Sequence, residues 1–137
     1  MTETVLILGG TREAAQIAAE FVRDHPDWRI ITSLAGRTKE PKPVLGEVRI
    51  GGFGGATGLA DWLRDNRIDA VIDATHPFAA RITANAAQAA AVVGLPHVVL
   101  ARPAWPPGAA HRVQSDREAA ALVARRGYQR VFLTTGR

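Results

Sequence analysis

The sequence of 137 residues contains no cysteine, and only 6% of its residues are aromatic. The absence of cysteine excludes disulfides, thiolate metal sites and cysteine nucleophiles. No run of about 18 apolar residues is present, which excludes a membrane-spanning helix. The N-terminus lacks a basic region followed by an apolar stretch, which is the pattern of a secretory signal. These absences predict a cytoplasmic protein without a membrane segment.

Motifs of several hydrolytic and metal-dependent enzyme classes are also missing. The four histidines have no ligand spacing that predicts a metal site: His25, His76, His97 and His111. The nucleophile motif G-x-S-x-G is absent, and the sequence shows no convincing Ser-His-Asp order. What remains is a sequence with 47% hydrophobic residues, which is enough to fill the core of one domain.

Charge is unevenly distributed along the chain. Residues 1–100 carry 10 basic and 11 acidic residues, whereas residues 101–137 carry seven arginines and two acidic residues. The formal net charge of +4 therefore arises in the C-terminal segment. A basic segment indicates an anionic partner, for which nucleic acid and a small polycarboxylate are both candidates. Because the aromatic residues are not interleaved with the basic ones as in single-strand binders, we expect no nucleic acid.

Short apolar runs alternate with amphipathic segments over the first hundred residues. Runs without a polar residue, such as 5–8, are typical of strands buried on both faces of a parallel sheet. The expected strands are 4–9, 28–34, 47–50, 70–74 and 97–100, and the expected helices are 13–24, 57–66 and 78–93. This alternation predicts an α/β fold, a Rossmann-like doubly wound parallel sheet, over residues 1–103.

A proline-rich segment follows this domain. Residues 104–109 have the composition of a linker. Beyond it, the pattern predicts a short strand at 111–113, a helix at 116–126 that Ser115 and Asp116 begin, and a strand at 130–134. One helix between two strands cannot close a core by itself, so residues 110–137 predict the truncated beginning of a second α/β domain.

The first strand ends in two glycines, Gly9 and Gly10, and a helix starts at once. A glycine turn before a helix is an anion site, because backbone N–H groups approach a phosphate and the helix dipole favours negative charge. The dinucleotide motif G-x-G-x-x-G/A aligns with Gly9, Thr11 and Ala14, so a threonine replaces the middle glycine. Gly10 can still permit close approach, and the Thr11 hydroxyl can donate to a phosphate oxygen. The alternative is a tight turn without a ligand.

The end of the second strand indicates the type of dinucleotide. NAD sites place an acidic residue there for the ribose 2′-hydroxyl, but this chain has Ser33, followed by Gly36 and Arg37. A hydroxyl, a glycine and an arginine fit a 2′-phosphate, which arginine binds through two charge-assisted hydrogen bonds. We therefore predict NADPH rather than NADH. The alternative is that Arg37 is a solvated loop arginine.

Two more loops follow strands at the edge where ligands of open α/β sheets bind. Gly52 and Phe53 belong to a glycine-rich loop after the third strand that has room for close approach of a ligand. The alternative is a mobile surface loop, although an exposed aromatic there is expected to pack against something. His76 follows the fourth strand and can orient a nicotinamide, contact the substrate or donate a proton. A rigid turn before Pro77 is the alternative for His76, and we expect Asp73 to brace loops rather than catalyse.

Five motifs follow one another over residues 5–105. They are Leu8-Gly9-Gly10-Thr11-x-Glu13-Ala14, Ser33-Leu34-Ala35-Gly36-Arg37-Thr38, Gly51-Gly52-Phe53-Gly54-Gly55, Asp73-Ala74-Thr75-His76-Pro77-Phe78-Ala79 and Arg102-Pro103-x-Trp105. In this order they resemble the precorrin-6A reductase family of cobalamin biosynthesis, and 131–137 resembles the family's entry into its second domain. Family members continue for about as many residues again, within the usual size of a second domain.

The resemblance implies a two-domain reductase that transfers hydride from NADPH to precorrin-6A, giving precorrin-6B. Relatives of the anaerobic pathway act on a cobalt-bearing macrocycle and can use NADH. A polycarboxylate tetrapyrrole substrate would account for the arginine-rich tail, including Arg102 and Arg137.

The resemblance also implies roles for single residues. Gly10, Thr11 and Arg12 would hold the pyrophosphate, and Ser33 and Arg37 the 2′-phosphate. Thr75 and His76 would line the nicotinamide region, with His76 the candidate catalytic residue. A non-enzymatic dinucleotide-binding module is the alternative function.

Overall fold

The computed structural model describes residues 2–36, 43–103, 106 and 108–134. The chain divides into two compact units, Met1–Arg102 and Pro103–Arg137. The assignment of the second unit to a substrate-side domain stays a prediction. Arg37 and Arg137, both predicted ligand contacts, lie outside the described residues.

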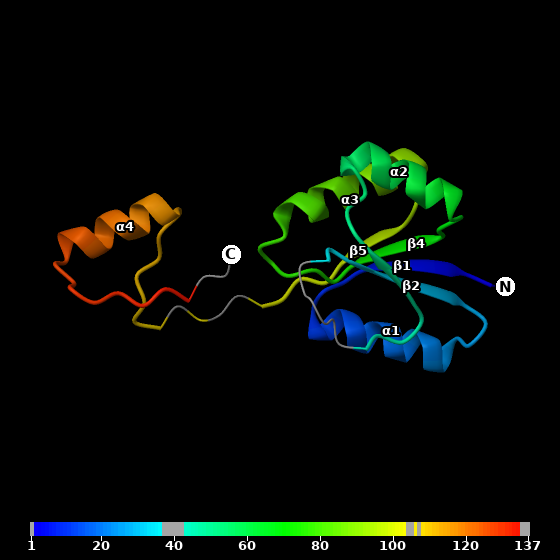
Figure 1. The fold of residues 1–137 in the computed structure, drawn as a ribbon, viewed down its shortest axis with the longest axis horizontal. Helices are drawn as coiled ribbons and strands as arrows, with labels where there is room; N and C mark the ends of the chain where they lie inside the picture. The colour runs from blue at the N-terminus through cyan, green and yellow to red at the C-terminus, as the bar shows by residue number, and fades with distance from the viewer. Residues whose placement is uncertain (1, 37–42, 104–105, 107, 135–137) are drawn as a thin grey trace. The chain divides into compact units, whose positions relative to one another are not determined.

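The first unit is a five-stranded parallel sheet in the order β3-β2-β1-β4-β5. Helix α1 covers one face of the sheet, and α2 and α3 cover the other (Figure 1). The elements are β1 (Thr4–Leu8), α1 (Arg12–Asp24), β2 (Arg29–Leu34), β3 (Glu47–Ile50), α2 (Gly55–Asp65), β4 (Ala70–Asp73), α3 (Ala80–Val93) and β5 (His97–Val99). This arrangement confirms the predicted Rossmann-like doubly wound sheet.

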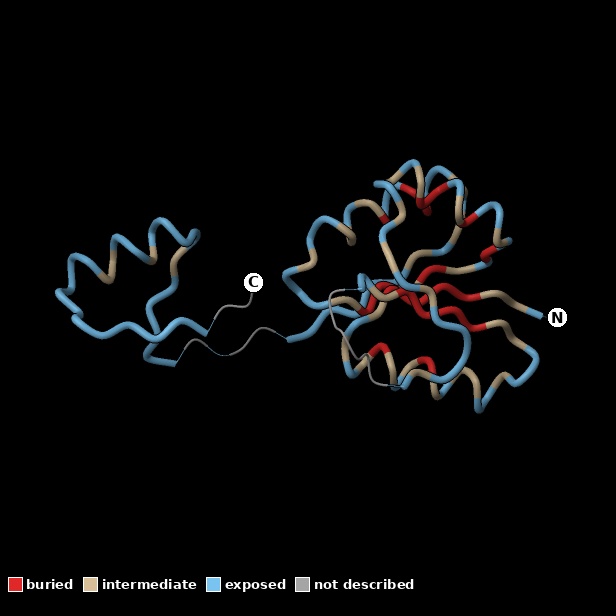
Figure 2. The backbone as a smooth tube through the Cα atoms, in the orientation of Figure 1, coloured by how far each residue is buried: buried red, intermediate tan, exposed pale blue. Residues whose placement is uncertain are grey.

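The core consists of two apolar layers on either side of the central strand. Successive residues of β1 point to opposite faces: Leu6 and Leu8 pack toward α2 and α3, and Val5 and Ile7 pack toward α1. Figure 2 shows the buried residues concentrated in the strands and on the inner sides of the helices. A slip of β1 by one residue would turn each of its side chains to the opposite face of the sheet, where it no longer fits the core on that side. The packing on both faces of β1 therefore fixes its register.

The carboxyl ends of β1, β2 and β4 meet at one edge of this sheet. The register pairs Leu8 with Ser33 on one side and with Asp73 on the other. The glycine turn, the end of β2 and the loop after β4 therefore begin at neighbouring positions. This edge positions the candidate site.

The second unit contains one helix, α4 (Asp116–Arg125), among its described residues. Its N-cap is Ser115, whose hydroxyl accepts a hydrogen bond from the backbone N–H of Glu118, as expected for the start of this helix. The predicted strands at 111–113 and 130–134 are wrong, since the described residues there adopt no strand. A strand forms where a neighbour pairs its backbone groups, and these segments have no such neighbour in the described part of the unit.

None of the helices in the described part of the chain has the length and apolar character needed to cross a membrane.

Candidate nucleotide-binding site

The glycine turn after β1 uses its two glycines for different reasons. The Gly9 N–H donates to the Ser33 carbonyl at 2.9 Å, which holds the turn against β2. A Cβ at Gly9 would lie 2.7 Å from Thr32 Cγ2, so only glycine fits this close approach. Gly10 instead has a φ of +96°, and no atom of the described residues would lie within 4 Å of a Cβ added there. The positive φ is what favours a glycine at position 10, and the space beside it can accommodate a ligand.

The N-terminus of α1 presents backbone donors to that space. Among the described residues, none accepts a hydrogen bond from the backbone N–H of Gly10, Thr11 or Arg12. The helix dipole adds a partial positive charge at the same point. This arrangement can hold an anion such as a pyrophosphate, as the glycine motif predicts.

Thr11 is the N-cap of α1, and its hydroxyl has two partners. Its Oγ1 accepts from the Ala14 N–H at 3.1 Å and donates to the Ala74 carbonyl at 2.6 Å. The hydroxyl hydrogen expected to reach a phosphate oxygen is therefore used within the protein. This leaves the Thr11 backbone N–H as its donor to a ligand. The bond to Ala74 also ties the glycine turn to the loop after β4.

Arg102 reaches the same helix terminus. Its guanidinium forms an ion pair with the carboxylate of Glu13 in the first turn of α1. The pair neutralises a carboxylate that would otherwise repel an anion bound at this terminus. A direct contact between Arg102 and a substrate stays a prediction.

The ends of β2 and β3 bring together Ser33 and Arg49, a residue that the sequence did not single out. The two are partners in the parallel register, and Arg49 Nη1 lies 3.3 Å from Ser33 Oγ. Arg49 also donates to the carbonyls of Gly51 and Gly52, each at 2.6 Å. Its guanidinium carbon lies 3.7 Å from the centroid of the Phe53 ring, a cation–π contact. Burial lowers the pKa of the Arg49 guanidinium from its usual value.

The glycine-rich loop after β3 packs against α2. The Phe53 and Trp62 rings meet edge to face with centroids 5.4 Å apart. A Cβ at Gly58 would lie 1.9 Å from the Phe53 carbonyl oxygen, so α2 touches the loop backbone directly. The expectation that Phe53 packs against something is confirmed. On the neighbouring loop, Gly36 has a φ of +75°, a conformation that favours glycine.

The loop after β4 is organised by Asp73. This carboxylate is 1% exposed and accepts from the Thr75 N–H at 3.0 Å, the Thr75 hydroxyl at 2.6 Å and the Thr83 hydroxyl at 2.5 Å. Its bracing role is confirmed, and the Thr75 hydroxyl hydrogen is used within the loop. His76 is exposed, and its Nδ1 accepts from the Phe78 N–H at 3.2 Å. In the neutral ring the proton is then on Nε2, which leaves Nε2–H as the donor available to a ligand.

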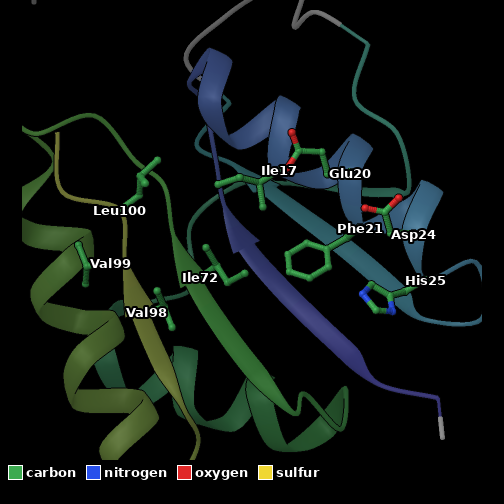
Figure 3. A pocket seen from close by; sticks show the side chains of 9 residues that line it. All are labelled: Ile17, Glu20, Phe21, Asp24, His25, Ile72, Val98, Val99 and Leu100. Carbon is green, nitrogen blue, oxygen red and sulfur yellow. The ribbon is translucent and has the colours of Figure 1, made fainter.

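An apolar groove of about 380 Å³ lies elsewhere in the same unit. Figure 3 shows Phe21 of α1 pointing toward Ile72 of β4, with Val98 of β5 nearby. None of the predicted cofactor residues that the structure describes lines this groove. The candidate site is therefore the carboxyl edge of the sheet rather than this groove.

Comparison with known proteins supplies the family. The family model described as "Precorrin-6x reductase CbiJ/CobK" matches residues 4–137. The precorrin-6A reductase of Mycobacterium tuberculosis (strain ATCC 25618 / H37Rv) is 59% identical over 133 residues, covering 97% of this chain and 53% of the relative.

Solved structures agree with this result. One described as "CobK precorrin-6A reductase" has a TM-score of 0.73 at 42% identity, covering 80% of this chain and 42% of that one. A structure described as "RSP in complex with beta-NADH" has a TM-score of 0.50 at 14% identity, covering 91% of this chain and 59% of that one, and shows a shared fold only. The chain spans about half the length of the curated relatives it matches. It belongs to the precorrin-6x reductase (CbiJ/CobK) family.

Proposed function

We propose that the first unit is the NADPH-binding domain of a reductase that converts precorrin-6A to precorrin-6B. The observation that carries this proposal is the set of backbone N–H groups at the start of α1 that have no acceptor among the described residues, in a chain of this family. They follow the first strand of a doubly wound sheet, where dinucleotides place their pyrophosphate.

The turn and the first helical residues bind the pyrophosphate. Gly9 seats the turn against β2, and the N–H groups of Gly10, Thr11 and Arg12 donate to the phosphate oxygens. The Arg102 guanidinium compensates the Glu13 carboxylate nearby. At this turn a phosphate would therefore meet several N–H donors, and the nearby carboxylate of Glu13 is already paired with Arg102.

The loops after β2 and β3 bind the adenosine half. Ser33, Gly36 and Arg37 hold the 2′-phosphate, which favours NADPH over NADH. Gly52 and Phe53 form the neighbouring wall, supported by the packing of Phe53 against Trp62. No carboxylate stands at the end of β2, where an NAD site has one.

The loop after β4 faces the reacting end. Thr75 and His76 line the nicotinamide position, with Asp73 fixing the loop from beneath. When bound, the nicotinamide supplies the hydride. With Nδ1 accepting from the Phe78 N–H, the Nε2–H of His76 can donate a hydrogen bond to the ligand; the transfer of a proton to the substrate would require the doubly protonated ring, in which Nδ1 no longer accepts from Phe78.

The substrate is an anionic tetrapyrrole, and the arginine-rich segment 101–137, including Arg102 and Arg137, provides complementary charge. Relatives are about twice as long as this chain. We therefore expect the 137 residues to bind NADPH and to reduce precorrin-6A slowly or not at all. Robust turnover by the chain alone would contradict this expectation.

A titration with NADPH, followed by nicotinamide fluorescence, tests the cofactor proposal. Gly10→Ala adds a Cβ in the open space beside the free N–H groups, and we expect at least a tenfold loss of affinity. Gly94→Ala is the matched control, because Gly94 has a φ of +81° and also has no neighbour within 4 Å. Both glycines have a positive φ, so each alanine variant carries backbone strain. Equal affinities of the two variants, or no binding by the wild type, would refute the proposed site.

A further inference from the structure

We propose that Arg49, together with Ser33, reads the 2′-phosphate of the dinucleotide and so sets the preference for NADPH. This inference rests on the proposed function and adds a specificity-determining residue to it. The candidate from the loop after β2 was Arg37, whereas Arg49 belongs to the next strand of the sheet.

Arg49 has no anionic partner in the described part of the chain. Four other described arginines form ion pairs with carboxylates: Arg23 with Asp24, Arg29 with Glu47, Arg64 with Asp61 and Arg102 with Glu13. Arg49 is partly buried, yet its recorded acceptors are two carbonyl oxygens and one hydroxyl. A desolvated cation without a counter-charge costs free energy, and a bound anion would remove that cost.

The guanidinium is also pre-oriented. The Gly51 and Gly52 carbonyls hold one edge, and the Phe53 ring lies against its face. Two of its five N–H donors, the Nε–H and one on Nη2, have no acceptor among the described residues.

In Arg29, the same two nitrogens, Nε and Nη2, bind an anionic group. Its Nε and Nη2 bind the two carboxylate oxygens of Glu47 at 2.8 and 2.9 Å. The same fork fits two oxygens of a phosphate.

The position of the pair matches the ribose end of the site. Ser33 and Arg49 are register partners one residue before the ends of β2 and β3. The ribose of a dinucleotide lies at the end of the second strand of such a sheet. Ser33 Oγ accepts from Arg49, and its own hydrogen has no acceptor in the described part of the structure. The hydroxyl can therefore donate to a phosphate oxygen beside the guanidinium.

The test compares ligands that differ only in the 2′-phosphate. The 137-residue chain and its Arg49→Met and Arg49→Lys variants are titrated with NADPH and NADH, and with 2′,5′-ADP and 5′-AMP. We expect Arg49→Met to weaken NADPH and 2′,5′-ADP at least tenfold and to leave NADH and 5′-AMP within about twofold. Arg49→Lys keeps the charge without the fork, so it should restore only part of the loss. Arg64→Met is the control, because this exposed arginine on α2 already pairs with Asp61.

The following outcomes would contradict the role proposed for Arg49. An equal loss for NADPH and NADH would mean that Arg49 only supports the glycine-rich loop. An unchanged preference in Arg49→Met, with the preference lost in Arg37→Ala, would assign the 2′-phosphate to Arg37 alone. If Arg49→Met does not fold, Ser33→Ala replaces it, with a selective loss for NADPH of several-fold expected and an equal loss for both ligands overturning the idea. A wild-type chain that binds neither dinucleotide would instead overturn the proposed function itself.

Discussion

Substitution of Thr11 by alanine removes a hydroxyl that joins two loops of the candidate site. Oγ1 caps α1 by accepting from the Ala14 N–H and also donates to the Ala74 carbonyl. Ala74 is 2% exposed, and its carbonyl accepts from no other group among the described residues. The variant would lose the cap and leave a buried carbonyl unpaired.

The expected magnitude follows from these two losses. Loss of an N-cap costs about 1 kcal/mol. An unpaired buried carbonyl costs about 1–3 kcal/mol. We therefore expect Thr11→Ala to lower the free energy of unfolding of the first unit by about 2–4 kcal/mol. Thr11→Ser keeps the hydroxyl, so it should cost less than about 1 kcal/mol.

Urea unfolding followed by tryptophan fluorescence measures this difference. Trp28 and Trp62 belong to the first unit, whereas Trp105 belongs to the second. A Trp105→Phe background therefore restricts the signal to the first unit. If Thr11→Ala and Thr11→Ser unfold within about 0.5 kcal/mol of each other, the hydroxyl contributes little and the proposed link between the loops is refuted. That margin lies below the cost of a typical lost cap.

Two further predictions concern carboxylates. Asp73→Ala leaves three donors without their acceptor and should destabilise the first unit by at least about 2 kcal/mol in urea unfolding, whereas Asp73→Asn keeps one acceptor oxygen and should cost less. The hydrogen bond from the Arg29 guanidinium lowers the pKa of Glu47. The ion pair therefore stabilises the fold at any pH above the ordinary pKa of a glutamate. This stabilisation is lost as the pH falls through the lowered pKa of Glu47. Both side chains are exposed, so the effect is small. Between about pH 5 and pH 3, the free energy of unfolding of the wild type should fall by no more than about 0.5 kcal/mol relative to that of Glu47→Gln. Urea unfolding of both proteins at each pH measures this difference.

The fold of the first unit could be predicted from sequence because most of its strands are short, mainly apolar runs bounded by glycine, proline or charge. The strand predicted at 47–50 agrees with β3, and the other four differ from the structure by one residue at an end. The failure at 130–134 has a physical reason. Apolar and β-branched residues favour a strand, but a strand also needs a partner, and pairing is a property of distant residues.

The candidate site was predictable only where it depends on local sequence. The glycine turn is a local feature and was predicted, whereas the capping role of Thr11 was not, although a threonine just before a helix is a local signal for a cap. The acceptor of the Thr11 hydroxyl is 63 residues away, and the neighbours of Arg49 depend on the register between β2 and β3. The available signal was one arginine within a short strand that leads into a glycine-rich loop with an aromatic residue. The role of this arginine, Arg49, becomes clear only from its pairing with Ser33 in the register between β2 and β3.

The threonine in place of the motif's middle glycine therefore does not argue against a dinucleotide site. In dinucleotide sites of this kind the pyrophosphate is bound by backbone N–H groups, which a threonine supplies as well as a glycine does. The two flanking positions keep the properties that the motif requires: Gly9 fits against β2, and Ala14 is 1% exposed where α1 packs on the sheet. The threonine side chain points to Ala74 rather than into the open space beside Gly10. The departure from the motif exchanges a ligand-facing glycine for an internal link between two loops and leaves the backbone donors in place.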